Sequence, residues 1–78
     1  MDNLKKYNEI MMDAFKVSEE ELKGLQYQAV PEWDSVGHMT MTAMLEEAFD
    51  IMLDTDDIID FSSYEKGIEI LRKYDIEL

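Results

Sequence analysis

The chain is organised around one stretch, Glu32-Trp33-Asp34-Ser35-Val36-Gly37-His38-Met39. Pro31 precedes it, fixes its own φ and biases the residue before it toward extended backbone, so no helix is expected to run through this point. Asp34 is a strong N-cap residue, because its carboxylate accepts N–H bonds from the next turn. The pattern over residues 36–49 is helical, so Ser35 is expected at the start of a helix. There its hydroxyl is exposed, where free N–H groups and the helix dipole favour an attached anion.

An Asp-Ser pair at a helix start is by itself a common cap. The longer string, Trp33 to Met39 followed by Leu45-Glu46-Glu47-Ala48-Phe49, closely resembles the modification site and second helix of acyl carrier proteins. The resemblance extends from about Leu4 to Leu78. In that family an Asp-Ser-(Leu/Val/Ile) triplet carries 4′-phosphopantetheine, taken from coenzyme A, on its serine through a phosphodiester. The resemblance therefore implies that Ser35 holds this cofactor and that Asp34 is the preceding motif residue.

Length and charge limit the class of protein. The chain has 78 residues, which predicts a single domain over 1–78 with a small core. A net charge of −12 repels nucleic acid and anionic lipid and attracts proteins with basic patches, while a hydrophobic share of 46% is too high for an acidic disordered tail. No apolar run approaches the roughly 20 residues that span a membrane, and no signal peptide is recognisable. The absence of cysteine fits a cytoplasmic location.

Helical periodicity predicts an all-α fold. A first helix, capped by Asp2 or Asn3, has its apolar residues at helical spacing up to Phe15. A capping box opens a short turn at Ser18, and a long, mostly irregular connection follows it. With the second helix, a short capped turn over Asp54–Phe61 and a last helix, the pattern predicts a four-helix bundle. It has three longer helices and one short helix, with a long loop between the first and the second.

The second helix has two faces. The expected core stripe consists of Met41, Met44, Leu45, Ala48, Phe49 and Met52, with Leu53 just beyond. The other face lies on the same side of the helix as Ser35. It is apolar near the serine and acidic farther along the helix. It consists of Val36, Met39, Thr40, Ala43 and Glu47, with Glu46 beside it. We interpret this second face as the docking surface for partner proteins. Burial of Val36 and Met39 in the core of a small bundle is the alternative.

The last helix is predicted to begin at a capping box formed by Ser62-Ser63-Tyr64-Glu65 and to run to about Tyr74. Its apolar stripe includes a glycine, Gly67, which costs roughly 1 kcal/mol relative to alanine inside a helix. A glycine at such a position indicates that another helix passes close to this one.

Two other kinds of chemistry have partial signals in the sequence. Ser35 and His38 are three residues apart on one helix, but nothing in the sequence supplies the orienting group and oxyanion hole of a hydrolase, so no catalytic residue is predicted. The acidic run from Asp54 fails as an EF-hand, because Ile58 and Ile59 stand where a ligand and a glycine are required. Loose binding of a divalent cation stays open for four carboxylates: Asp54, Asp56, Asp57 and Asp60.

The resemblance implies a carrier rather than an enzyme. Such a protein holds an acyl or aminoacyl group as a thioester on the arm and passes it between enzymes. Its expected partners are a phosphopantetheinyl transferase, an acyl- or aminoacyl-loading enzyme and a downstream acyltransferase or synthase with basic docking patches, with the carrier itself a monomer. The Trp-Asp-Ser-x-Gly-His-Met form is similar to small stand-alone carriers of specialised bacterial biosynthetic pathways. The alternative is an unmodified acidic helical adaptor that binds a basic protein.

Overall fold

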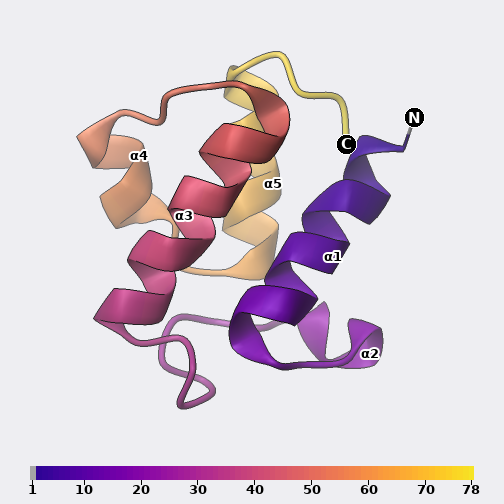
Figure 1. The fold of residues 1–78 in the computed structure, drawn as a ribbon, viewed down its shortest axis with the longest axis vertical. Helices are drawn as coiled ribbons and strands as arrows, with labels where there is room; N and C mark the ends of the chain where they lie inside the picture. The colour runs from indigo at the N-terminus through magenta and orange to yellow at the C-terminus, as the bar shows by residue number, and fades with distance from the viewer. Residues whose placement is uncertain (1) are drawn as a thin grey trace.

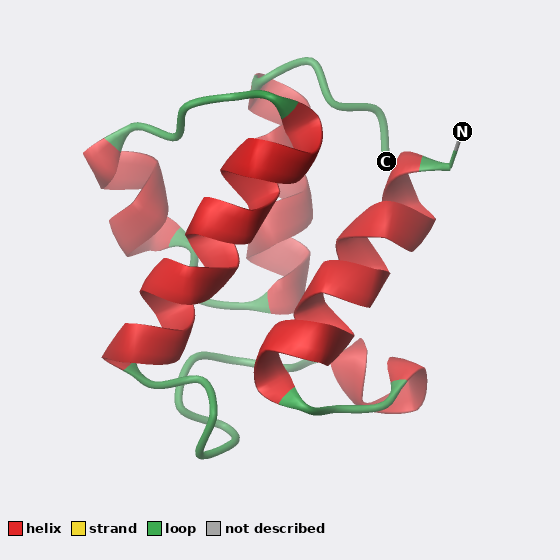
Figure 2. Cartoon of the chain, viewed as in Figure 1, coloured by secondary structure: helices red, strands yellow, loops and turns green. Residues whose placement is uncertain are grey.

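The computed structural model describes residues 2–78, and over that range it contains five α-helices and no β-strand (Figure 2). The longer helices are α1 (Asn3–Phe15), α3 (Ser35–Phe49) and α5 (Tyr64–Lys73), and the short ones are α2 (Glu19–Leu22) and α4 (Thr55–Asp60). The prediction of an all-helical chain is confirmed. No helix within this range is long and apolar enough to cross a membrane.

The helices surround one core, with α1 packed against α3 and α5 behind them, while α4 lies beyond α3 and α2 lies beside the lower end of α1 (Figure 1). The radius of gyration is 11.2 Å, close to the roughly 11.5 Å expected of a compact chain of this length. The start of α1 and the C-terminal end of the chain lie at the upper right of Figure 1, whereas α3 begins at the lower left. The start of α3 is therefore far from both of them.

Helix α1 begins where Asp2 caps it, because the Asp2 carboxylate accepts a hydrogen bond of 3.2 Å from the Lys5 N–H. It ends at Lys16, which adopts a left-handed conformation with φ of 57°. The buried residues of α1 recur at helical spacing and face the core: Tyr7, Ile10, Met11 and Phe15.

Helix α3 ends before the predicted core stripe does. Met41 and Leu45 are fully buried, as the stripe predicts. The helix stops at Phe49, and Asp50 turns the chain with φ of 54°. Met52 therefore lies outside the helix and is 86% exposed. The prediction that Met52 continues the core stripe is wrong, because the helical periodicity on which it depends stops three residues earlier.

Helix α5 is capped differently from the prediction. Ser63, not Ser62, is the N-cap, and its hydroxyl accepts a hydrogen bond of 3.0 Å from the Lys66 N–H. The Glu65 carboxylate, predicted to complete a capping box, instead accepts a hydrogen bond of 2.8 Å from the Gly24 N–H. Glu65 thus holds the long connection to the start of α5. The distant Gly24 N–H has replaced the N-cap N–H of the same helix as the partner of its carboxylate.

Gly67 lies at the close approach that the sequence predicts. A Cβ atom at this position would overlap the ring of Phe61 and the hydroxyl of Tyr7. That hydroxyl donates a hydrogen bond of 2.8 Å to the Tyr64 carbonyl. Burial, with smaller effects from Tyr64 and Glu65, raises the pKa of Tyr7 well above its ordinary value. The hydroxyl therefore stays protonated and serves as a fixed donor in the core.

The connection over residues 23–34 is irregular but well anchored. The Trp33 side chain is fully buried and stacks on Phe15, with ring centroids 4.4 Å apart. Midway along, the Tyr27 N–H donates to the Ser62 carbonyl at 2.9 Å, and Leu25 accepts from the Tyr64 N–H at the same distance. These bonds hold the connection against the start of α5 and leave Trp33 to carry it into the core.

Candidate functional site

Ser35 is the first residue of α3 and its side chain is exposed. Asp34 is the N-cap, as predicted, and its carboxylate accepts a hydrogen bond of 2.8 Å from the Gly37 N–H. The cap fixes the first turn of the helix, so the serine hydroxyl projects from a rigid base. Because the first turn of any helix leaves several N–H groups without helical partners, an anion attached to Ser35 would lie near donors and the positive end of the dipole.

Gly37 is required where the long connection meets α3. A Cβ atom on Gly37 would overlap the carbonyl oxygen of Glu32. The backbone of the connection therefore lies directly against the first turn of α3, two residues after Ser35. Glycine is the residue that permits this contact, because it carries no Cβ.

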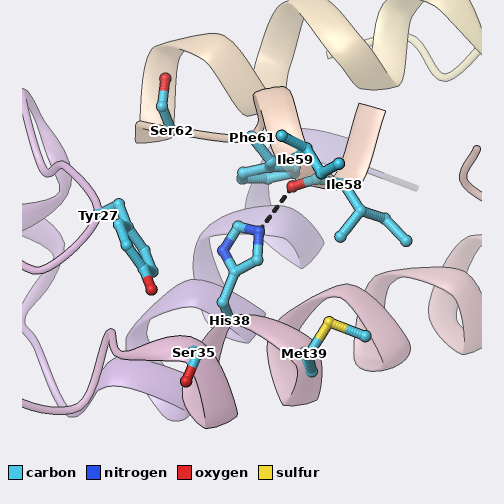
Figure 3. A pocket seen from close by; sticks show the side chains of 8 residues that line it. All are labelled: Tyr27, Ser35, His38, Met39, Ile58, Ile59, Phe61 and Ser62. Atoms are coloured by element: carbon cyan, nitrogen blue, oxygen red, sulfur yellow. Dashed lines mark hydrogen bonds between the residues drawn. The ribbon is translucent and has the colours of Figure 1, made fainter. Parts of the chain in front are cut away.

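His38 joins three parts of the site. The Trp33 indole Nε1–H donates to His38 Nδ1 at 2.9 Å, and His38 Nε2 lies 2.7 Å from the Ile58 carbonyl oxygen, as the dashed line in Figure 3 shows. Indole is only a donor and a carbonyl only an acceptor, so Nδ1 accepts and Nε2 carries the proton. The ring is thus fixed as one neutral tautomer that connects the long connection, α3 and the end of α4.

This geometry leaves His38 without a free nitrogen. Both ring nitrogens are bonded to groups other than Ser35, so His38 has no acceptor for the proton of the Ser35 hydroxyl. A general base must lie within hydrogen-bond reach of the proton that it removes and must have a free lone pair. A Ser35–His38 nucleophile and base pair is therefore absent from this conformation.

A pocket of about 350 Å³ lies next to Ser35. In Figure 3, Ser35 and Met39 lie along α3 on one side, the residues that belong to α4 or follow it lie on the other, and Tyr27 closes one end. Most of the wall is apolar, and it includes no acidic residue, lysine or arginine. The lining residues are Tyr27, Ser35, His38, Met39, Ile58, Ile59, Phe61 and Ser62.

Only part of this pocket could be predicted from the sequence. Ser35, His38, Met39 and the loop from Gln26 to Trp33 that borders Ser35 are predictable from the sequence, whereas the far wall around α4 is not. The far wall could have been suspected from Ile58 and Ile59, since two apolar residues within an acidic run indicate burial or contact with another segment. No sequence pattern places Tyr27 near His38, because their rings meet edge to face at 5.5 Å only through the tertiary fold.

The predicted docking face of α3 points outward. Val36 is 72% exposed and Met39 is 56% exposed, which excludes the alternative that they are core residues. Thr40, Ala43 and Glu47 are also exposed. Glu46 differs from them, because it is half-buried and its carboxylate accepts a hydrogen bond of 2.9 Å from the Leu53 N–H. Its role in this structure is to hold the segment that follows α3.

The four aspartates around α4 do not converge. Asp57 is buried, and its two carboxylate oxygens bond to Lys73 Nζ and to the Tyr74 hydroxyl, each at 2.6 Å. These hydrogen bonds hold the pKa of Asp57 below its usual range, and the bond that Lys73 donates to Asp57 raises the pKa of Lys73. No three acidic or histidine side chains within residues 2–78 are grouped as metal ligands. The geometry therefore gives no support to a divalent site at Asp54, Asp56, Asp57 and Asp60.

The site thus consists of an exposed serine on a capped helix, an apolar pocket beside it and an outward face with apolar and acidic residues. Neither a comparison with models of known protein families nor a comparison with curated proteins finds a match for this chain.

Proposed function

We propose that this chain is a carrier protein with the four-helix bundle and long first loop of acyl carrier proteins. In this proposal Ser35 holds 4′-phosphopantetheine, and the arm carries an acyl or aminoacyl group as a thioester. The observation that carries the proposal is the position of Ser35, exposed at a capped helix start and on the edge of an apolar pocket. A hydroxyl there is open to a modifying enzyme, and a group attached to it would reach an apolar surface without crossing the core.

The attachment reaction needs little from the carrier itself. The Ser35 Oγ attacks the phosphorus of coenzyme A that bears pantetheine, and the new P–O bond forms as the bond to the adenosine bisphosphate breaks. The adenosine bisphosphate leaves, and the hydroxyl proton goes to a base of the transferase, since His38 has no free nitrogen. The thiol that later holds the cargo belongs to the arm. The chain supplies a rigid attachment point, an apolar pocket beside it and a docking surface.

The modification test compares two serines of the same pocket. Wild type, Ser35→Ala and Ser62→Ala are each incubated with coenzyme A and a phosphopantetheinyl transferase, and the intact mass is measured. We expect the mass of one arm on wild type and on Ser62→Ala, and none on Ser35→Ala. The Ser35→Ala variant is expected to fold normally, because Asp34 provides the cap and exposed substitutions change stability by no more than about 0.5 kcal/mol. Modification of Ser35→Ala at the wild-type level would place the arm elsewhere.

The docking test uses the outward face of α3. Met39→Ala removes an apolar contact and is expected to slow modification at every salt concentration, whereas Glu47→Lys reverses a charge and is expected to slow it most at low salt. Met52→Ala and Glu69→Lys make the same changes at exposed positions away from this face. Wild-type rates for both α3 variants would show that the transferase docks on another surface.

A second candidate function, an unmodified acidic adaptor, has one observation in its favour. Val36 and Met39 are exposed apolar side chains on the same outward face of α3 as the exposed carboxylate of Glu47. An adaptor would bind a basic protein through this same face with Ser35 unmodified. Wild-type chain isolated from its own cell with an unmodified Ser35, and refractory to transferase and coenzyme A, would favour this candidate over the carrier.

A further inference from the structure

Helix α4 contributes little to the apolar core. It spans six residues, and the only one that is buried is Asp57. Ile58 is half-buried and Ile59 is 72% exposed. A helix of this length is not stable on its own in water. The position of α4 therefore depends on the groups that hold it to its neighbours.

Polar contacts hold α4 from two directions. On one side, the Asp57 carboxylate bonds to Lys73 and Tyr74 at the end of α5, and the Tyr74 hydroxyl also accepts from the Asp54 N–H at 2.9 Å. On the other side, the carbonyl of Ile58 accepts from His38 Nε2. The first set of contacts connects α4 to α5, away from the pocket. The bond from His38 is the one that crosses the pocket and connects α4 to the start of α3.

His38 makes this bond from a rigid position. Its Nδ1 accepts from Trp33, whose side chain is fully buried and stacked on Phe15. The ring therefore cannot rotate without breaking a hydrogen bond to a core residue. The bond from Trp33 thus keeps Nε2–H directed at the Ile58 carbonyl, and a pre-organised donor of this kind favours one position of a weakly held segment.

We propose that His38 is a positioning residue that holds α4 closed against the pocket beside Ser35. When the bond from Nε2 to the Ile58 carbonyl is made, Ile58 and Ile59 form the far wall of the pocket (Figure 3). When it breaks, the remaining polar contacts of α4 are those to α5, while the buried side chains of Leu53 and Phe61 still hold the two ends of the segment at the core, and the pocket widens between them. The use of this opening by a group carried on Ser35 rests on the proposed function, whereas the positioning of α4 does not.

Two substitutions separate the bonds that His38 makes. The side chain of His38→Gln is long enough to place an amide donor near the position of Nε2 and keeps the bond to Ile58. The shorter side chain of His38→Asn can place its oxygen near the position of Nδ1 and keeps the bond from Trp33, but it does not reach Ile58. If His38 only filled space in the fold, the two variants would behave alike.

The experiment measures amide hydrogen exchange and the fluorescence emission of Trp33, which is the single tryptophan of the chain, on unmodified protein. We expect His38→Asn to accelerate exchange in α4 about five- to tenfold, the effect of one lost hydrogen bond, with α1 and α5 unchanged. We expect exchange in His38→Gln to stay near wild type. The emission should behave oppositely, shifting in His38→Gln and staying near wild type in His38→Asn.

Tyr74→Phe is the matched control, because it weakens the opposite connection of α4 without touching His38. It should accelerate exchange in α4 and leave the Trp33 emission unchanged. The proposal is overturned if exchange in α4 is the same in His38→Asn and His38→Gln, or if it rises only together with that of α1 and α5. Neither measurement involves the arm, so failure of Ser35 to be modified would overturn the proposed function and leave this result standing.

Discussion

Helices α4 and α5 follow one another in the chain, but different forces hold them. Helix α5 buries Ile70 and Leu71 in the core, and Gly67 brings it into contact with Phe61. Helix α4 buries only Asp57 and is connected to its neighbours by hydrogen bonds and an ion pair. Helix α5 is therefore part of the core, whereas α4 is attached to the core.

This difference determines which part of the molecule can move. Apolar burial is non-directional, so a buried helix leaves the core only when many contacts are lost together. A hydrogen bond contributes roughly 0.5–1.5 kcal/mol and can break by itself. The two walls of the pocket beside Ser35 differ, since Met41 and Leu45 anchor α3 in the core, whereas α4 itself has no fully buried apolar side chain. Motion at the site is therefore expected at α4.

The largest effect on stability is expected from truncating a side chain of α5 that is buried in the core. Leu71→Ala removes a fully buried side chain and should lower the free energy of unfolding by about 2–5 kcal/mol. Ile58→Ala, in α4, should cost clearly less, because that side chain is only half-buried. Urea denaturation of both variants measures the two costs. Equal costs would show that α4 belongs to the core after all.

A smaller effect is expected from adding a methyl group at the two glycines that make close contacts. Gly67→Ala forces a Cβ into Phe61 and Tyr7 and should lower the free energy of unfolding by about 1–3 kcal/mol. Gly37→Ala forces a Cβ into the Glu32 carbonyl, a backbone atom of the long connection, which must move to make room. Its effect should be concentrated in that connection, as faster amide exchange over residues 26–34. Uniform acceleration across all helices in Gly37→Ala would contradict this division.

The ion pair of α4 should make part of the stability depend on pH. Because hydrogen bonds from Lys73 and Tyr74 lower the pKa of Asp57, its contribution is complete above the ordinary aspartate value of about 3.9 and is lost as the pH falls through the lower folded-state value. The difference in unfolding free energy between wild type and Asp57→Asn should therefore be constant near neutral pH and shrink below about pH 4. Asp56→Asn, at the exposed neighbouring position, is the control. A difference that does not change with pH would show that the pair contributes nothing.

The smallest effect is expected at the outer edge of the pocket. Ile59 is 72% exposed, so Ile59→Ser should change the free energy of unfolding by no more than about 0.5 kcal/mol. Thermal or urea denaturation is sufficient to measure it. A loss above 1 kcal/mol would mean that the Ile59 side chain is buried in solution and that the pocket is more closed than in this structure.

Local features of the molecule could be predicted from the sequence. The cap at Asp34 and the close approach at Gly67 were both expected, because each depends on the chemistry of one residue and its nearest neighbours. The predictions that Ser62-Ser63-Tyr64-Glu65 forms a capping box and that Met52 is a core residue were wrong. Glu65 found a partner 41 positions away, and the end of α3 removed Met52 from the helix.

The hydrogen-bond partners of His38 could not be predicted either, because they also depend on the tertiary fold. A histidine near a helix start indicates a polar residue at the surface, and only the fold brings Trp33 and the Ile58 carbonyl to its two nitrogens. The pocket has the same origin, since it is formed by segments from three parts of the chain. Sequence periodicity identifies which residues share a helix, but it does not state which helices meet.

The start of α1 and the C-terminal end of the chain lie on the opposite side of the molecule from the start of α3 (Figure 1). An affinity tag, a fluorescent domain or a solid support can therefore be joined to either end without covering Ser35. Immobilised in this way, the chain would present its serine, the pocket and the outward face of α3 to the surrounding solution. That orientation suits surface-based binding assays, in which candidate partner proteins flow over the tethered domain.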